Sequence, residues 1–265
     1  MQLLKTTLAI AAAIFTTSAA SAGPVITNGN FSQATETGQT SCGLAPTTVC
    51  SEELGGTSPY PTSATDVTGW TSAGYNFLLT PGVATGAGAP TPEYGNSFSL
   101  WGMANGGANS WNGAGPGPGN GGNFIALDGD YNTGAMSTLV TGLTAGSIYA
   151  ISFSFAFGQQ AGFTGATVQN MIVTLGSQSI NALASNYDLP SEGFSGWMYD
   201  TLYFTADASS ETLSFLAYGN VPVPPFALLA GVEIPEPNSL VLSGVGLAGV
   251  IGLALRRRAA ARGAA

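Results

Sequence analysis

Apolar and polar residues alternate along much of the chain, which is the pattern of half-buried β-strands. The clearest example spans residues 148–157. One face of this segment carries large side chains and the other carries small ones: Tyr149, Ile151, Phe153, Phe155 and Phe157 against Ala150, Ser152, Ser154 and Ala156. A period of two predicts a strand whose large residues enter a core. We expect its small face to lie under a loop or to face solvent.

Other segments with apolar alternation predict further strands, at 123–127, 136–141, 170–175, 199–205, 212–218 and 226–234. We expect 136–141 to pair with 148–157 through the turn at 142–146. We also expect 199–205 and 212–218 to form a hairpin.

Two stretches of Gly, Asn, Ser, Thr and Pro, 34–66 and 102–123, predict surface loops. Such segments bury too little apolar area to offset the entropy lost on ordering. Helical periodicity is almost absent between the two ends of the chain. The pattern therefore predicts an all-β fold, a jelly-roll-type β-sandwich that residues 23–233 form as one ectodomain.

The N-terminus has the features of a secretory signal peptide. Lys5 supplies the positive charge, residues 8–15 are apolar, and Ala20-Ser21-Ala22 offers small residues for cleavage. We expect residues 1–22 to be removed and the mature chain to begin at Gly23.

The C-terminus predicts a transmembrane helix at residues 239–255. These 17 residues carry no charge, and as a helix they reach about 25 Å, close to the thickness of a bilayer core. The arginines that follow should stay in the cytoplasm by the positive-inside rule, with 259–265 as a cytoplasmic tail. The ectodomain would then face outward.

The tail resembles the PEP-CTERM sorting signal of Gram-negative bacteria that make extracellular polysaccharide. The signature is Pro235, Glu236 and Pro237, the apolar segment follows, and Arg256, Arg257 and Arg258 close it, so that the signal spans 234–258. The resemblance implies that exosortase, a membrane protease-transferase, recognises the tail while it is transiently inserted in the inner membrane. It also implies export through that membrane and, after C-terminal processing, residence at the cell surface or in the medium.

The charge distribution excludes several functions. The five basic residues lie in the two ends, at Lys5, Arg256 to Arg258 and Arg262, and there is no histidine. Residues 23–255 thus carry all 14 acidic residues and no cation, a formal charge of −14. Nucleic-acid binding is excluded, as are a Ser-His-Asp triad and a lysine Schiff base. Phosphate-bearing substrates are disfavoured for the same lack of cations. The acidity favours solubility of an exported domain, and the alternative is that carboxylates bind Ca²⁺.

The two cysteines, Cys42 and Cys50, are close in sequence and lie in an exported segment. This favours a disulfide bond that closes a small loop.

The ectodomain is similar to galactose-binding-like jelly rolls. The matching segments are residues 25–31 (VITNGNF), 124–130 (FIALDGD), 142–149 (GLTAGSIY) and 228–232 (LLAGV). Relatives of this kind often carry acidic residues where this chain has Ser32 and Ala230. Because those acids help to hold a structural calcium in some relatives, the resemblance does not extend to that site.

The first choice for a calcium site is Asp128, Asp130 and Asn132, which occupy alternate positions like the first ligands of a calcium loop. The rest of an EF-hand is missing, because position six is Thr133 and position twelve is Leu139. The interpretation we favour is a polar turn after a strand. No other cofactor is expected.

Trp101 and Trp111 are candidate stacking platforms for sugar rings, because both lie beside the Asn-rich loop. Trp70 and Trp197 are expected to be core residues, since tryptophan usually buries most of its area.

A catalytic function is not expected. A glycosidase needs two facing carboxyl groups, and no spacing among the acids is distinctive. The sequence therefore predicts a non-catalytic, exported cell-surface or extracellular-matrix protein. The alternative is a carbohydrate-binding module that recognises matrix polysaccharide.

Overall fold

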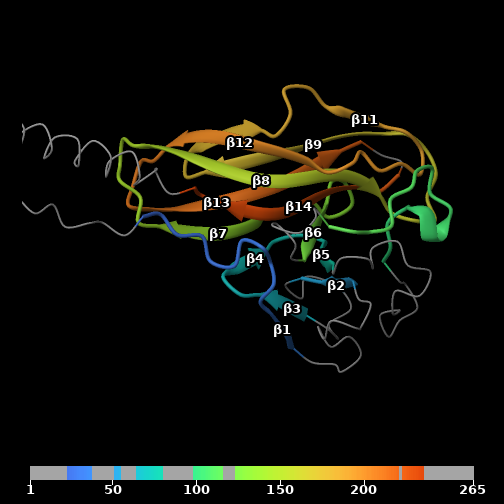
Figure 1. Cartoon of the computed structure of the whole chain (residues 1–265), viewed down its shortest axis with the longest axis horizontal. Helices are drawn as coiled ribbons and strands as arrows, with labels where there is room; N and C mark the ends of the chain where they lie inside the picture. Colours follow the sequence, from blue (N-terminus) through green and yellow to red (C-terminus); the bar gives the residue numbers. More distant parts are fainter. Residues whose placement is uncertain are drawn as a thin grey trace, which may run out of the picture.

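The computed structural model describes residues 23–37, 51–54, 64–79, 98–115, 123–220 and 223–235. Apart from one short 3-10 helix (η1, Met103–Asn105), the regular elements of these residues are all β-strands (Figure 1). They form two six-stranded antiparallel sheets, and the expected all-β sandwich is confirmed. The predicted signal peptide 1–22, membrane helix 239–255 and tail 259–265 lie outside the described residues.

The first sheet, called the β9 sheet here, has the order β10-β9-β13-β7-β4, and β11 also pairs with β9. Its strands are β4 (Trp70–Ser72), β7 (Met136–Thr141), β9 (Thr167–Leu175), β10 (Gln178–Asn181), β11 (Tyr187–Leu189) and β13 (Ser210–Gly219).

The second sheet, called the β8 sheet, has the order β12-β8-β14-β6-β5-β2. Its strands are β2 (Ser51–Glu53), β5 (Asn76–Leu79), β6 (Phe124–Asp128), β8 (Ile148–Gln159), β12 (Met198–Thr205) and β14 (Pro225–Glu233). A separate pair joins β1 (Ala34–Thr37) to β3 (Ala64–Val67).

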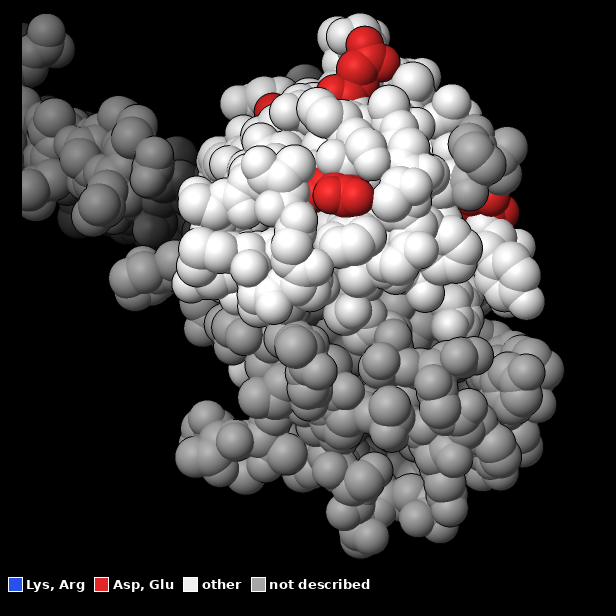
Figure 2. Space-filling model, turned by 90° about the vertical axis from the view of Figure 1, so that its right-hand side faces the viewer, with Lys and Arg blue, Asp and Glu red and all other residues white. Residues whose placement is uncertain are grey.

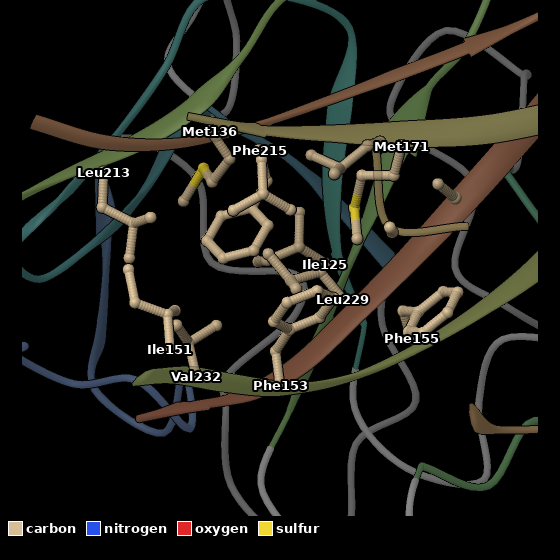
Figure 3. Packing of buried hydrophobic residues seen from close by; sticks show 14 of the residues in the cluster. Ile125, Met136, Ile151, Phe153, Phe155, Met171, Leu213, Phe215, Leu229 and Val232 are labelled. Atoms are coloured by element: carbon tan, nitrogen blue, oxygen red, sulfur yellow. The ribbon is translucent and has the colours of Figure 1, made fainter. Parts of the chain in front are cut away.

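The main core lies between the two sheets, as Figure 3 shows. The alternation of β8 is confirmed, because Phe153 and Phe155 are buried in this core. Phe153 meets Phe215 of β13 edge to face, with ring centroids 5.3 Å apart. The large face of β8 is therefore the one that holds the sheets together.

Two predicted strand pairings are wrong. Strand β7 pairs with β13 and not with β8, and β12 pairs with β8 and not with β13. Each of the two connections instead crosses from one sheet to the other, and they bond to each other. Gly146 N donates to Ala206 O (2.7 Å), and Ala206 N donates to Ser147 O (2.9 Å). Neither connection has the two-residue turn that favours a tight hairpin.

The predicted loops are only partly loops. Strands β1, β2 and β3 lie wholly or partly within 34–66, and each has only three or four residues. The strands β4, β5, β10 and β11 were not predicted either, because runs of three or four residues are too short for a period to show. Within 102–123, the described residues form η1 and irregular backbone.

Candidate functional site

The outer face of the β8 sheet, which points away from the β9 sheet, carries a second apolar cluster. Strands β5, β6, β8 and β14 supply its floor: Phe77, Leu79, Phe124, Ala126, Ala156, Phe226, Leu228 and Ala230. The loop 98–115 covers that floor with Phe98, Leu100 and Trp111. Phe98 stacks on Phe77, with ring centroids 3.9 Å apart. The glycine- and asparagine-rich loop is therefore anchored to the sheet by its few large residues.

Trp111 is a core residue of this cluster. Only 8% of it is exposed, and its ring stacks on Phe194 with centroids 4.0 Å apart. Its Nε1–H donates to Ala114 O (3.0 Å), and Trp197 Nε1–H donates to the same oxygen (2.9 Å). Phe194, which is distant in sequence, therefore covers the ring that the sequence suggested as a platform for sugar stacking.

Trp101 is half-buried at the end of the sandwich. Its Nε1–H donates to Phe163 O at 2.6 Å. Phe163 is 44% exposed, and the nearby Met103 is 61% exposed. Trp101 therefore keeps part of its surface available for a ligand, as a candidate stacking residue would need.

Trp70 is buried in the main core, as expected. Its Nε1–H donates to Thr27 O (2.9 Å), and its ring meets Phe31 edge to face at 5.1 Å. Trp197 is half-buried and packs against the outer cluster rather than the main core.

The outer face of β12 and the residue before it display aromatic side chains, of which only Trp197 was singled out from the sequence. Trp197, Tyr199 and Tyr203 alternate with the inward-facing residues of the strand, and we call these three the aromatic row. Tyr199 is 58% exposed and Tyr203 is 66% exposed. In the sheet register they lie beside Ser154 and Ala150 of β8. Because both faces of this segment are rich in large residues, alternation alone gave no sign of which aromatics were exposed.

Thr201 lies between the two tyrosines, on the same face of β12. Its hydroxyl bonds to the hydroxyl of Ser152 on β8 at 2.8 Å. In the same register row, Ser152 is opposite Glu233 of β14, which is exposed. Polar groups thus occur beside the aromatic rings on this face.

The free edge of β12 is blocked at two positions by side chains. Gln178 of β10 accepts a bond from Thr205 N at 3.2 Å and donates one to Thr205 O. Asp200 Oδ1 accepts from Thr201 N at 2.7 Å. Such bonds occupy backbone groups that another strand would need for pairing.

Asp128 ends β6 and caps the turn that follows it. Its Oδ1 accepts from Asp130 N (3.1 Å) and Tyr131 N (3.2 Å), and its Oδ2 accepts from Asn132 N (2.6 Å). Burial raises the pKa of this carboxyl above its ordinary value, and the three N–H donors oppose that shift only in part. This is the polar turn that we favoured from the sequence.

The predicted calcium ligands therefore do not form a cluster with free oxygens. Both carboxylate oxygens of Asp128 are engaged by backbone N–H groups, and Asp130 and Asn132 are exposed. In the described part of the chain, no group of three or more His, Cys, Asp or Glu side chains could hold a metal ion.

The surface lacks cationic groups wherever the structure describes it, because all Lys and Arg residues lie in the two undescribed ends. Figure 2 shows one end of the sandwich, where scattered carboxylates interrupt an otherwise uncharged surface. The described carboxylates therefore have no ion-pair partner among these residues, and a polyanionic ligand would meet only repulsion.

The family comparison concerns the C-terminus. The model of the PEP-CTERM protein-sorting motif matches residues 233–258. The chain carries a PEP-CTERM sorting motif. This motif indicates export and exosortase-dependent sorting to the cell surface. Its match begins at Glu233, the last residue of β14, so the PEP-CTERM motif starts where the sandwich ends.

Most of the predicted sorting residues lie outside the described residues, as do both cysteines. Pro235 is the last described residue, and it is exposed. Glu236, Pro237 and Arg256 to Arg258 follow it, whereas Cys42 and Cys50 fall in the gap between 37 and 51. Among the described residues, no helix has the length and apolar character needed to cross a membrane.

Several solved carbohydrate-binding modules resemble the fold. TmCBM61, in complex with β-1,4-galactotriose, has a TM-score of 0.31 and 10% identity over 64% of this chain and 89% of its own. A CBM4 module has a TM-score of 0.31 and 13% identity over 80% of this chain and 99% of its own. At such values the likeness carries no conclusion about a ligand of this chain. No curated protein sequence matches it.

Proposed function

We propose that this is a non-catalytic protein of the cell surface or the extracellular polysaccharide matrix, exported and then processed by exosortase. The observation that carries the proposal is the PEP-CTERM motif at residues 233–258. Because β14 ends at Glu233, cleavage near Pro235 would release the sandwich without removing a strand.

The absence of histidine and the arrangement of the carboxyl groups support a non-catalytic function. Burial raises the pKa of the Asp128 carboxyl, and its oxygens accept hydrogen bonds from the backbone of a turn. A glycosidase would need a second carboxyl group facing such an acid across a substrate. A non-enzymatic function therefore fits the described residues better.

Mass spectrometry of the native exported protein tests this proposal. We expect a chain that begins at Gly23 and ends near Pro235, with Cys42 and Cys50 joined in a disulfide bond. A matched Glu236→Ala variant should retain the C-terminal tail if the signature is required for processing. Exported wild-type protein that still ends at Ala265 would contradict exosortase processing.

The second candidate function is carbohydrate binding by the ectodomain, and the exposed aromatic side chains on β12 favour it. Tyrosine rings can stack on the apolar faces of sugar rings, while neighbouring hydroxyls bond to the sugar. Co-sedimentation of the purified protein with the polysaccharide of its own producer strain tests this function. Release of reducing sugar in the same assay, abolished by substitution of an acid, would instead establish an enzyme.

A further inference from the structure

We propose that the aromatic row of β12 (Trp197, Tyr199 and Tyr203) is the binding site for an extended, uncharged oligosaccharide. This inference rests on the carbohydrate-binding candidate and assigns it a site and a substrate class. Neither Trp101 nor Trp111 is part of the row, so the two locations can be separated by mutation.

The exposure of the rings is the first argument. Tyr199 and Tyr203 are each more than half exposed, whereas a tyrosine that serves packing buries most of its ring. Neither ring makes an aromatic contact within the described part of the chain. Trp197 continues the row towards the outer cluster, where Phe124 and Phe194 hold its indole from the side. The ring of Trp197 is therefore held in place by its neighbours, whereas the rings of Tyr199 and Tyr203 are exposed to solvent.

The spacing of the rings sets the size of the ligand. Tyr199 and Tyr203 are four residues apart on one face of a strand, which corresponds to about 13 Å. A single sugar ring cannot reach both tyrosines, but an extended oligosaccharide that follows the strand can contact both. Affinity should therefore rise with the length of the sugar chain until both rings are engaged.

Polar groups at the row match the hydroxyls of a sugar. The half-buried Thr201 lies between the tyrosines, with its hydroxyl bonded to that of the buried Ser152, and the phenolic groups add donors and acceptors. Glu233 occupies the same register row as Ser152 and is exposed, so it can accept bonds from sugar hydroxyls.

The negative charge of the domain indicates the chemical class of the ligand. The described residues include no cation that could neutralise a uronate or sulfate group, and Glu233 adds a negative charge near the row. An acidic polysaccharide would thus be repelled, most strongly at low ionic strength. A neutral glycan has no such penalty.

A second copy of the chain is a poorer occupant of this surface. Pairing through the edge of β12 would require the backbone groups of Thr201 and Thr205 that Asp200 and Gln178 already occupy. Hydroxyl and phenol groups on the outer face also suit a hydrated ligand better than an apolar protein interface.

Calorimetric titration of the purified ectodomain tests the proposal. The probes are neutral hexasaccharides of glucose, galactose, mannose and xylose, their trisaccharides, and a hexamer of galacturonic acid. We expect at least one neutral hexasaccharide to bind more tightly than its trisaccharide, with no binding of the acidic hexamer. Tyr199→Ala and Tyr203→Ala should each weaken binding about tenfold. Tyr131→Ala is the matched control, because this tyrosine is 74% exposed but lies in the turn after β6 and not in the aromatic row.

Four outcomes would overturn the proposal. Hexasaccharide binding that survives both tyrosine substitutions would reject this site but keep carbohydrate binding, and Trp101→Ala would then test the other location. Preference for the acidic hexamer would reject the substrate class. No binding to any probe would reject both the site and the carbohydrate-binding candidate while leaving exosortase sorting intact. A wild-type dimer in sedimentation that Tyr203→Ala dissociates would identify a second copy as the occupant.

Discussion

The two faces of the β8 sheet are buried by different means. On the inner face, Phe153 and Phe155 meet side chains from the other sheet. On the outer face, the same strand carries Ser152 and Ser154, and the cover nearby comes from a loop rather than a sheet. The outer face therefore has two parts: loop 98–115 covers one of them, and on β12 the rings of Tyr199 and Tyr203 remain exposed.

The inner face should dominate stability. Phe153→Ala removes a fully buried ring between the sheets, and we expect the free energy of unfolding to fall by about 3–5 kcal/mol. Urea denaturation followed by circular dichroism measures this change. Tyr203→Ala on the outer face is the control and should alter stability by no more than about 0.5 kcal/mol. Equal losses in both variants would abolish the distinction between the faces.

The loop-covered part of the outer face should matter nearly as much. Trp111→Ala removes the ring that stacks on Phe194 and the bond to Ala114 O, so we expect a loss of about 2–4 kcal/mol. Trp101→Ala is the matched control, because its ring is only half-buried. If the Trp111 variant kept wild-type stability in the same denaturation assay, the loop would not be part of the core.

The sequence predicted the strands of this fold better than their pairing. The alternation in 148–157 located β8 because it is a ten-residue run of period two. Pairing depends on contacts between distant segments, here those between the crossing connections at Gly146 and Ala206, and no local pattern encodes them.

The candidate site was predicted only in part for the same reason. Trp111 has small polar neighbours in sequence, yet Phe194 covers it in space. The exposure of Tyr199 and Tyr203 depends on what lies above them, which alternation does not report. Asp128 was correctly interpreted as a turn residue because the bonds of its side chain are local, to residues two to four positions away.

Asp128, at the end of β6, should contribute to stability from the rim of the sandwich, in addition to the contributions of the two faces of the β8 sheet. Asp128→Ala deprives three backbone N–H groups of their acceptor, and we expect a loss of about 1–3 kcal/mol. Thermal unfolding at pH 6 measures it, with the exposed Asp130→Ala as control. If Asp130→Ala lost as much stability as Asp128→Ala, the cause would be the removal of a negative charge and not the loss of the backbone cap.

The pH dependence of the same carboxyl gives a smaller effect. Because burial raises its pKa in the folded state, the fold binds the proton more tightly than the unfolded chain does. The resulting stabilisation is complete below the unfolded pKa and is lost as the pH rises through the folded pKa. Stability of the wild type should therefore fall over this acidic window, and Asp128→Asn should flatten the slope. A slope that is unchanged in the variant would show that other carboxyl groups control it.

Salt should have the smallest effect on stability. The sign of this effect shows whether repulsion between the surface carboxylates outweighs attraction between charges. The described carboxylates have no cationic partners, so screening weakens repulsion without breaking any ion pair among these residues. We expect the unfolding temperature at pH 7 to rise by about 1–2 °C between 10 mM and 300 mM sodium chloride, as a gain of about 0.5 kcal/mol would give. At pH 3, where most carboxyl groups are protonated, the same salt increase should have little effect. A fall in the unfolding temperature with salt at pH 7 would mean that attractive charge pairs outweigh repulsion in the folded chain.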